Sequence, residues 1–484
     1  MSKILPIPRA VIAALKGGAG KTFITVGLVA ALKARGLSVG VFKKGPDYID
    51  AGWLGLAAGT DCHNLDSYLF SEAIVLKSFM QQSPARDLAI VEGNRGLYDG
   101  LDPQGGYSTA ELAKLLKAPV VLIIDAAKMT RTAAALVVGC KALDPAVEIK
   151  AVILNRVAGT RHENVLRESI EEAAEVPVIG SVKKMPLEDF PQRHLGLLTL
   201  YEHPKAAEFV EAAARIVEES IDLDRLLEIS SSACRLDVPD TVNQPPPSLP
   251  DRCSGLRIGV LKDSAFQFYY PENLEALRVT GADLVEISAL EPNELPHLDC
   301  LYIGGGFPET HSDILAGNAV FKDSLRKAVE GGLPVYAECG GLMYLSRNLL
   351  VDDNVYPMVG VFPVDTVLER RPQGHGYIRA EVTAPNPFYP LGTILTGHEF
   401  HYSYVTGMYA NTAQYAFKVL RGHGIDGERD GICTSNVLGT YIHVHALGTP
   451  LWARGLLAGA AEYHAAHAAM SAGESRGNSL QALP

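Results

Sequence analysis

Residues 333–345, LPVYAECGGLMYL, decide how the rest of this chain is interpreted. The apolar run at the start of this stretch predicts a buried strand, and the apolar residues at its end have the spacing of one helical face. Between them, Glu338, Cys339 and two glycines predict a sharp turn with a thiol at the start of a helix. Unpaired amides and the helix dipole favour thiolate at such a position, so Cys339 is a candidate nucleophile. The alternative is that Cys339 packs in the core as a small hydrophobic side chain.

Two other stretches favour the nucleophile. Residues 299–307, DCLYIGGGF, predict a buried strand that ends in glycines, whose backbone N–H groups can stabilise an oxyanion. Residues 437–445, VLGTYIHVH, predict a strand that carries His443 and His445 on one face. A cysteine, a glycine-rich donor loop and a late histidine are the parts of a Cys–His acyl-transfer site.

In this order, the parts resemble the class I glutamine amidotransferase domain over roughly residues 256–460. The resemblance implies that the cysteine takes the amide group of glutamine as a thioester and releases ammonia. Many members of that class carry an acidic residue two positions after the histidine, where this chain has His445, as the cobyrinate-type members do. The resemblance implies Cys339 as nucleophile, His443 as base, and oxyanion or glutamine-binding roles for Gly305, Gly306, Phe307 and Gly340.

Composition limits the possible classes of protein. A chain of 484 residues is expected to form two to four domains, and 47% hydrophobic with 20% charged residues is typical of a soluble globular protein. The formal charge of −12 argues against non-specific nucleic-acid binding, which needs Lys and Arg to neutralise phosphates. The N-terminal apolar stretch is too short for a membrane span, so we expect no membrane partner and a cytoplasmic location. Seven cysteines without a CxxC pair suggest neither a zinc site nor a disulfide framework.

The N-terminal part begins with a phosphate-loop pattern. Residues 9–15, RAVIAAL, predict a strand, and the loop KGGAGKT at 16–22 leads into an amphipathic helix that ends near Gly36. Glycine N–H groups can wrap phosphates, Lys21 can neutralise the β/γ charge, and the Thr22 hydroxyl can reach Mg²⁺. Because the loop opens with a lysine, it also resembles the variant loop of the ParA/MinD ATPases. The residues predicted to bind ATP are Lys16, Gly17, Gly18, Gly20, Lys21 and Thr22.

Acidic residues follow two further predicted strands, residues 37–43 (LSVGVFK) and 87–93 (DLAIVEG). Acidic groups at the carboxyl ends of parallel strands lie beside the ligand crevice of an α/β sheet. We therefore expect Thr22, Asp47 and Glu92 to complete a Mg²⁺ shell, the alternative being that the carboxylates are solvated loop residues. Strands and helices continue to alternate, which predicts a doubly wound parallel sheet.

The domain boundaries follow from composition. Residues 231–255 are rich in proline and serine and predict a linker between a P-loop domain at 1–230 and a second α/β domain at 256–465. Residues 466–484 predict a mobile tail. The expected fold class is therefore α/β, with a P-loop doubly wound parallel-sheet domain followed by a class I glutamine amidotransferase domain.

Motifs from both parts of the chain occur in one order: FKKGPDYID, VEGNRGLYDGLD, YIGGGFPE, AECGGLMYL, GHEFHYS and GTYIHVH. Together they resemble the cobyrinic acid a,c-diamide synthase family, ATP- and glutamine-dependent amidases of tetrapyrrole carboxylates. The loop KGGAGKT departs from the serine- or threonine-bearing loops expected at its start, and GNRGLYDGLD with KKGPDYID also resembles relatives that amidate sirohydrochlorin or sirohaem. Which tetrapyrrole is amidated therefore stays open.

The resemblance implies ATP and Mg²⁺ as cofactors. The first domain would use them to convert an acetate side chain into an acyl phosphate, which ammonia displaces. Asp47, Tyr48, Glu92 and Asp99 would lie at the ATP and substrate crevice, with Asp47, Tyr48 and Asp99 toward the substrate or the intermediate. The implied partners are small molecules, a tetrapyrrole carboxylate and glutamine, and two copies could associate as a homodimer.

Two other classes of protein stay in consideration. One is a ParA/MinD-like regulatory ATPase, which does not need an elbow cysteine, an oxyanion loop and a late histidine. The other is a non-catalytic scaffold, which would be expected to lose Cys339 or His443, although both are present. The sequence therefore favours the amidase.

Overall fold

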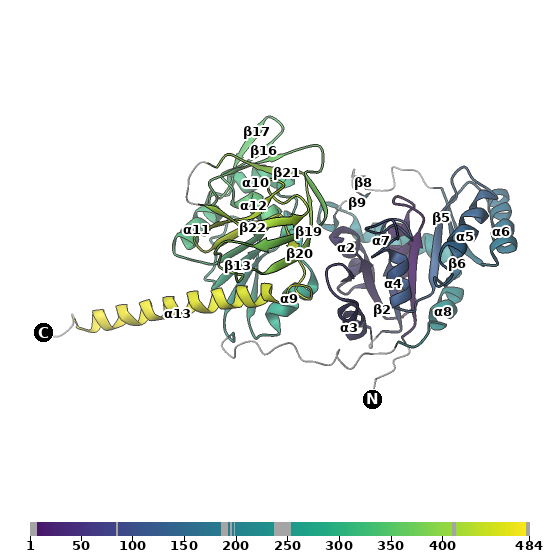
Figure 1. The fold of residues 1–484 in the computed structure, drawn as a ribbon, viewed down its shortest axis with the longest axis horizontal. Coiled ribbons are helices and arrows are strands. Elements are labelled where there is room, and N and C mark those ends of the chain that lie inside the picture. The colour runs from purple at the N-terminus through teal and green to yellow at the C-terminus, as the bar shows by residue number, and fades with distance from the viewer. Residues whose placement is uncertain are drawn as a thin grey trace. The chain divides into compact units, whose positions relative to one another are not determined.

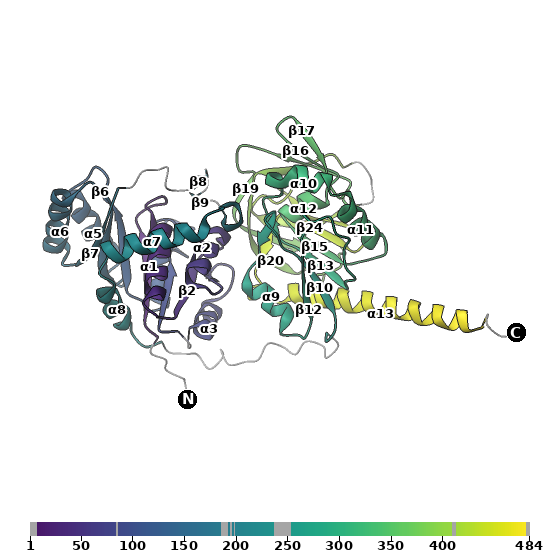
Figure 2. The same ribbon diagram turned by 180° about the vertical axis from the view of Figure 1, so that it is seen from behind.

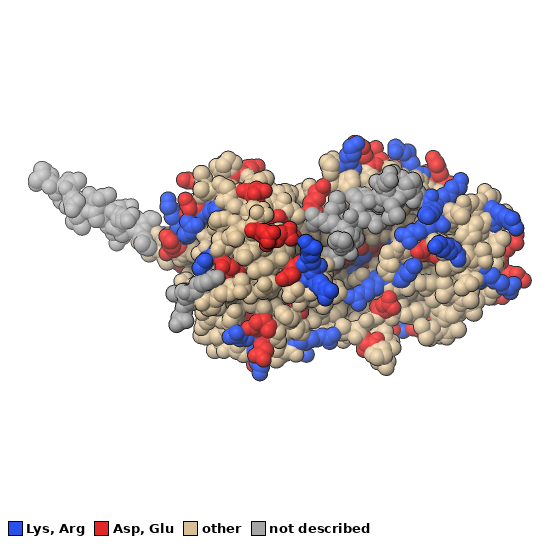
Figure 3. Space-filling view, turned by 90° about the horizontal axis from the view of Figure 1, so that it is seen from above, with Lys and Arg blue, Asp and Glu red and all other residues tan. Residues whose placement is uncertain are grey.

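The computed structural model describes residues 7–83, 86–184, 192–193, 196–197, 199–236, 253–408 and 413–480. The chain divides into two compact units, Met1–Gln244 and Pro245–Pro484. Most of the predicted linker at 231–255 lies outside the described residues. Figure 3 shows Lys and Arg side chains interspersed with Asp and Glu on the face that it presents, over both units.

The first unit is built on a seven-stranded parallel sheet with the order β3-β2-β4-β1-β5-β6-β7. Because β4 lies between β1 and β2, the chain segments that follow these three strands meet at one edge of the sheet. That edge is where the sequence placed the phosphate loop and the acidic residues. The strands are β1 (Arg9–Ala14), β2 (Val39–Lys44), β3 (His63–Leu65), β4 (Leu88–Glu92), β5 (Val120–Asp125), β6 (Ile149–Val157) and β7 (Val178–Lys183).

Helices cover both faces of this sheet, which explains why its strands are almost uniformly apolar. The helices α1, α2, α7 and α8 share one apolar core with the sheet, whereas α3 packs on the other face, where the Phe42 and Phe79 rings lie 4.9 Å apart. Figure 1 shows α4 in front of the sheet, and the reverse view of Figure 2 brings α1 and α7 to the front. The helices are α1 (Lys21–Ala34), α2 (Tyr48–Ala58), α3 (Glu72–Gln82), α4 (Thr109–Leu115), α5 (Thr132–Leu143), α6 (Thr160–Ala174), α7 (Ala206–Ser220) and α8 (Leu223–Ser231).

The second unit contains a ten-stranded mixed sheet with the order β12-β10-β13-β15-β24-β23-β22-β19-β20-β25. The first five of these strands are parallel, and the others continue the sheet in antiparallel pairs. The strands are β10 (Arg257–Leu261), β12 (Asp283–Ile287), β13 (Cys300–Ile303), β15 (Val335–Glu338), β19 (Gly374–Val382), β20 (Ile394–His401), β22 (Gln414–Arg421), β23 (Arg429–Thr434), β24 (Val437–Thr440) and β25 (His443–Val444).

Two apolar cores lie on the two faces of this sheet. One core includes α9 (Pro271–Arg278) and the start of α13 (Leu451–Leu480), and the other includes α10 (Ser312–Gly317), α11 (Ala319–Glu330) and α12 (Gly340–Leu345). A small sheet, β17-β16-β18-β21, and the pair β11-β14 complete the unit. The bounds of these strands are β11 (Phe266–Phe268), β14 (Gly305–Gly306), β16 (Asn348–Val351), β17 (Asn354–Pro357), β18 (Asp365–Leu368) and β21 (Ser403–Thr406).

The two sheets confirm the expected α/β fold class. The segment that was predicted as a mobile tail from residue 466 belongs to the helix α13 as far as Leu480. Trp452, Leu456 and Ala460 are spaced by four residues and are buried, which anchors the start of this helix to the sheet. The alanines that follow have the highest helix propensity of any residue, so composition had pointed to helix there. Within the described residues, no helix combines the length and the apolar character needed to cross a membrane.

Candidate active sites

Cys339 lies in a strained turn between β15 and α12. Its backbone has φ 47° and ψ −97°, a conformation that residues other than glycine rarely adopt. The following glycines permit close packing, since a Cβ at Gly340 would lie 3.1 Å from the Gly306 amide nitrogen, and one at Gly341 would lie 2.7 Å from the Ile303 oxygen. The strand, sharp turn and helix predicted from the sequence are therefore present, with the glycine loop directly against the turn.

The thiol of Cys339 is enclosed. The residue is 6% exposed, and the thiol donates to the Phe400 backbone oxygen at 3.9 Å. Burial raises the pKa of Cys339, and the negative charge of Glu309 adds to this effect, while a hydrogen bond from the Gly340 N–H opposes it. Burial of the thiol therefore opposes the stabilisation of the thiolate that we expected from the start of helix α12. A neutral thiol needs a base to remove its proton.

His443 is the base that the sequence proposed, and it lies on β25 in the same glycine-lined region. A Cβ at Gly305 would lie 2.5 Å from His443 Cε1 and 3.3 Å from Nε2, so this edge of the ring faces the glycine loop. The other ring nitrogen, Nδ1, lies 3.4 Å from Glu338 Oε2. The ring of His398, directly opposite on β20, stacks on His443 at 4.8 Å. Burial and the neighbouring His443 hold the pKa of His398 well below its ordinary value.

The glycine loop is only partly free to bind an oxyanion. Gly305 and Gly306 form β14 and pair with β11. The Phe307 N–H donates to the Ala265 oxygen at 2.9 Å, so this amide is already used within the fold. A role for Phe307 in binding glutamine would therefore fall to its ring, which lies 5.2 Å from that of Phe268. The Gly340 N–H already points toward the Cys339 sulfur.

The sequence analysis did not predict the carboxylates that lie beside the two histidines of the VLGTYIHVH stretch. Glu338 is fully buried, accepts from the Tyr302 hydroxyl at 3.1 Å and faces His443. His445 lies 3.5 Å from Glu272, a buried carboxylate at the start of α9. The sequence did contain a signal for Glu338, because a carboxylate at the end of an otherwise apolar strand is rarely buried without a partner.

The phosphate loop of the first unit surrounds the start of α1. Gly18 and Gly20 have φ 71° and 86°, which glycine adopts without strain, and Gly20 caps the helix. A Cβ at Gly17 or Gly18 would meet no atom within 4 Å, so the space in front of the loop is open. Lys21 is only 7% exposed and donates to the Arg95 oxygen at 2.7 Å. An open glycine loop at a helix N-terminus is suited to phosphate.

Behind the loop lies a charge cluster that we call the acidic cluster, in which Lys43 and Glu92 are buried and Asp47 and Asp50 are partly exposed. Lys43 Nζ lies 2.6 Å from both Asp50 Oδ2 and Glu92 Oε1. The Thr22 hydroxyl donates to the same Glu92 oxygen at 3.1 Å. Asp47 accepts from the Asp50 N–H at 2.9 Å, which caps α2. The structure thus brings Thr22, Asp47 and Glu92 together as expected, and it adds Lys43 and Asp50.

Electrostatics within the acidic cluster favour a further cation. Burial raises the pKa of Glu92 and of Asp47, and in both cases the charge of Asp50 adds to the effect. The pKa of Lys43 is raised although burial opposes this, because Asp50 and Glu92 favour its charged form. Three carboxylates therefore share Lys43 as their ammonium partner in the cluster, with Lys21 close enough to add to it.

Thr22 and Glu92 offer oxygen atoms that are suited to Mg²⁺. Glu92 Oε2 is buried and has no hydrogen-bond partner, and the other oxygen of this carboxylate, Oε1, accepts from the Thr22 hydroxyl, so these two residues fit a hard cation. One oxygen of Asp47 is already used as a helix cap, which makes it a poorer ligand. In the described parts of the chain, no group of three His, Cys, Asp or Glu residues is arranged as a complete metal site. Phosphate oxygens and water would have to complete the shell.

The remaining predicted residues lie around the same edge of the sheet. Tyr48 is the first residue of α2. Asp99 accepts from the Gly96 N–H at 2.9 Å and adds to the negative potential felt by Lys21. Lys16 is exposed and lies 3.3 Å from Asp125 at the end of β5. All three residues therefore follow strands of the sheet at the edge where the phosphate loop lies.

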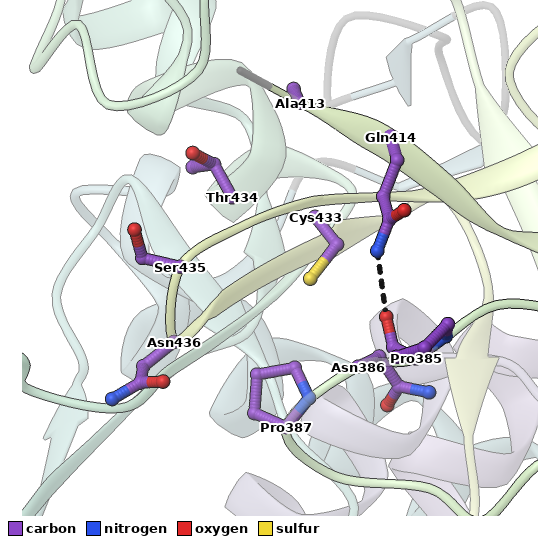
Figure 4. A pocket seen from close by; sticks show the side chains of 9 residues that line it. All are labelled: Pro385, Asn386, Pro387, Ala413, Gln414, Cys433, Thr434, Ser435 and Asn436. Atoms are coloured by element: carbon purple, nitrogen blue, oxygen red, sulfur yellow. Dashed lines mark hydrogen bonds between the residues drawn. The ribbon is translucent and has the colours of Figure 1, made fainter.

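A separate cavity of about 440 Å³ lies in the second unit, shown in Figure 4. It contains Cys433 and Asn436, and Gln414 donates to the Pro385 oxygen across it at 2.9 Å. Asn436 directly precedes β24, whereas Cys339 follows the parallel neighbour β15, so the cavity is at the opposite ends of these strands. Burial raises the pKa of Cys433 to about 11. The cavity is therefore distinct from the site around Cys339.

Two family models match the chain, one in each unit. Residues 10–197 match the CobQ/CobB/MinD/ParA nucleotide binding domain, and residues 257–450 match the CobB/CobQ-like glutamine amidotransferase domain. The first model also covers MinD and ParA proteins, so the nucleotide-binding half alone does not separate the amidase from the regulatory ATPase. The match of the second half argues against a regulatory ATPase.

Relatives of nearly the same length extend this result. A protein named cobyrinate a,c-diamide synthase from Magnetococcus marinus is 43% identical over 452 residues, 92% of this chain and 96% of that protein. Proteins of the same name are 42% identical in Archaeoglobus fulgidus, over 93% of this chain and 98% of that protein, and 39% identical in Listeria monocytogenes, over 92% and 96%. None of these three names supports the sirohydrochlorin alternative. The order of the two matched domains and the coverage of these relatives confirm the resemblance seen in the motifs: the chain belongs to the cobyrinate a,c-diamide synthase family.

Proposed function

We propose that this chain uses ATP and glutamine to convert acetate side chains of a cobyrinate-type tetrapyrrole into amides. The observation that carries the proposal is the strained Cys339 turn, packed against a glycine loop that also contacts the edge of His443. The full-length relatives named cobyrinate a,c-diamide synthase support the substrate class. The open phosphate loop with its acidic cluster supplies the second half-reaction.

In the glutaminase half-reaction, His443 Nε2 takes the proton of the Cys339 thiol as the sulfur attacks the amide carbon of glutamine. The oxygen of that amide gains negative charge, which free N–H groups of the glycine loop stabilise. The C–N bond then breaks, and ammonia leaves with the proton that His443 returns. Water hydrolyses the thioester to glutamate and restores the thiol.

In the synthetase half-reaction, the acetate oxygen of the substrate attacks the γ-phosphorus of ATP, and ADP leaves. Ammonia attacks the acyl carbon of the resulting acyl phosphate, and phosphate leaves. Lys21 and the N–H groups of the loop hold the phosphates, and Asp99 borders the substrate side. Bound Mg²⁺ would be held by Thr22 and Glu92 and would neutralise charge on the phosphate oxygens.

The location follows from these chemical requirements. The reaction consumes ATP and depends on a reduced thiol at Cys339, and the cytoplasm supplies both conditions. We therefore propose a cytoplasmic enzyme whose partners are small molecules. Fractionation of cells that express the tagged full chain tests this location directly.

The reaction itself is tested with purified protein, ATP, Mg²⁺ and glutamine. Cobyrinate, sirohydrochlorin and sirohaem are offered separately, and the product mass reports each conversion of acid to amide. The proposal expects amide formation on cobyrinate, with glutamate, ADP and phosphate released. Amidation of sirohydrochlorin or sirohaem without amidation of cobyrinate would contradict the substrate assignment, and ATP hydrolysis without any amide would contradict the reaction type.

A further inference from the structure

We propose that Glu338, the residue directly before Cys339, is the carboxylate that positions His443 for proton transfer. This inference rests on the proposed glutaminase function of Cys339 and His443. Glu338 Oε2 lies 3.4 Å from His443 Nδ1, while the Nε2 edge of the same ring faces the glycine loop at Gly305. One ring nitrogen thus lies near the carboxylate and the other near the glycine loop, which packs against the Cys339 turn.

This arrangement selects one tautomer of the imidazole. A carboxylate beside Nδ1 accepts its N–H, which leaves the lone pair on Nε2 to take the thiol proton. The same carboxylate stabilises the imidazolium that forms when the proton is taken. Because burial raises the pKa of the Cys339 thiol, removal of its proton depends strongly on a base that is oriented and stabilised in this way.

Glu338 is held in place by neighbours on two other strands. It is the last residue of β15 and is fully buried. The Tyr302 hydroxyl on β13 donates to Oε2 at 3.1 Å, and the Val444 N–H on β25 donates to Oε1 at 3.4 Å. A buried carboxylate without partners would destabilise the fold, so these contacts and the histidine explain how the charge is tolerated.

The other titratable groups around the imidazole do not take this role. His398 on β20 stacks on the ring, and its pKa lies well below the ordinary value because of burial, so it stays neutral. The ring of His445 lies 4.4 Å from that of Tyr270. The carboxylate of Glu272 on α9 lies 3.5 Å from His445 Nε2. The Glu272 carboxylate is therefore a matched control, buried in the same unit but paired with a different histidine.

Three tyrosines complete the surroundings of Glu338. Tyr302 and Tyr336 are buried and Tyr269 is partly buried, and each has a raised pKa, mainly from desolvation and partly from the charge of Glu338. They remain neutral near pH 7 and act as dipoles or packing groups. The negative charge next to His443 is therefore that of Glu338.

The test compares Glu338→Gln, Glu338→Asp and Glu272→Gln in the full chain, with glutamate release as the readout. Glu338→Gln keeps the shape but removes the charge, so we expect glutamine-dependent kcat to fall about 100-fold or more. The KM for glutamine should change by less than about threefold, because Glu338 acts through His443 and not on glutamine. The acidic limb of the kcat/KM profile should move to lower pH, since the imidazolium has lost its anionic neighbour.

The other variants separate positioning from folding. Glu338→Asp keeps the charge and should retain more activity than Glu338→Gln, with the pH profile of the parent. Glu272→Gln should keep glutaminase activity within about threefold. If Glu338→Gln does not fold, Tyr302→Phe removes a donor that holds the carboxylate and should lower kcat by about 3- to 10-fold.

The outcomes distinguish this inference from the proposed function. Unchanged glutaminase rate and pH profile in Glu338→Gln, with activity lost in Cys339→Ala, would overturn the positioning role and leave the function intact. Equal loss of glutamine- and ammonium-supported amidation in a folded Glu338→Gln protein would indicate a structural role and also overturn it. Full glutaminase activity in Cys339→Ala would instead contradict the proposed function.

Discussion

Lys43 Nζ and Glu92 Oε1 lie 2.6 Å apart, and both side chains are buried almost completely. The pair lies directly behind the phosphate loop, because Thr22 donates to the same carboxylate oxygen. Such a pair is costly to break, since removal of one partner leaves an uncompensated charge in the interior. The Lys43–Glu92 pair therefore stabilises the first unit and also positions a carboxylate beside the predicted ATP site.

Replacement of Lys43 by methionine should therefore destabilise the first unit. Asp50 and Glu92 would lose their ammonium partner, and we expect the free energy of unfolding to fall by about 3 to 5 kcal/mol. Lys16→Met is the control, because Lys16 is 66% exposed and its contact with Asp125 should contribute less than about 1 kcal/mol. Denaturant unfolding of both variants provides the measurement. Equal stability of the two variants would contradict the claim that the first unit depends on the buried ion pair of Lys43.

The sequence predicted those parts of the two sites that depend on contacts between residues close together in the chain. The phosphate loop and the Cys339 turn were predicted because their signals lie within a few consecutive residues. The pairing of Lys43 with Glu92 depends on β2 and β4 being neighbours in the sheet, and Glu338 meets His443 only because β25 folds back beside β20. A single stretch of sequence does not show which strands become neighbours in a sheet.

Burial and strand pairing also depend on contacts that are distant in sequence. The thiolate argument for Cys339 considered the helix dipole, but the surrounding core raises the pKa of the thiol. Phe307 was assigned an oxyanion or glutamine-binding role, and its N–H donates to Ala265 across a short strand pair that the sequence does not reveal. Lys21 lies in a glycine loop and is nevertheless only 7% exposed.

Lys21→Ala should abolish ATP-dependent amidation with glutamine and with ammonium salts alike. The variant removes the charge that the loop offers to phosphate and also the hydrogen bond to the Arg95 oxygen. Because the side chain is buried, we expect a loss of about 1 to 2 kcal/mol in stability without nucleotide. Calorimetry with Mg·ATP and thermal unfolding give the two values. Retained turnover would show that the loop is not the ATP site.

Glu92→Gln should raise the Mg²⁺ concentration needed for half-maximal activity, because it replaces a hard anionic ligand with a neutral amide. Asp47→Asn should have a smaller effect, since asparagine can also cap α2 and one Asp47 oxygen is already used there. Asp99→Asn is expected to slow amidation with little change in nucleotide binding. ATP affinity over a Mg²⁺ series checks all three, and parent-like Mg²⁺ dependence in Glu92→Gln would remove that residue from the metal site.

Asp430 predicts a pH dependence of stability in the second unit. Burial raises its pKa to about 7, although N–H groups of Gly431 and Tyr441 favour the charged form. The folded protein therefore keeps a proton that the unfolded chain has released, and stability falls as the pH rises from the unfolded pKa of 3.8 to about 7. The slope from this group is at most about 1.4 kcal/mol per pH unit.

Asp430→Asn should remove this contribution, because asparagine does not titrate and can still accept from the Tyr441 N–H. Between pH 4 and 7, the stability of the variant relative to the parent should therefore rise with pH. Denaturant unfolding across this range measures the difference. A constant difference between the two proteins would mean that Asp430 is already ionised in the folded state.

The central claim is that Cys339 supplies ammonia to a separate, ATP-dependent amidation. The most direct measurement is cobyrinate amidation by Cys339→Ala, with ATP and Mg²⁺ present and either glutamine or an ammonium salt at raised pH as nitrogen donor. We predict no amide with glutamine and near-parent amidation with ammonium, because the variant leaves the phosphate loop and the acidic cluster unchanged. Amide formation from glutamine, or equal loss with both donors, would contradict the account.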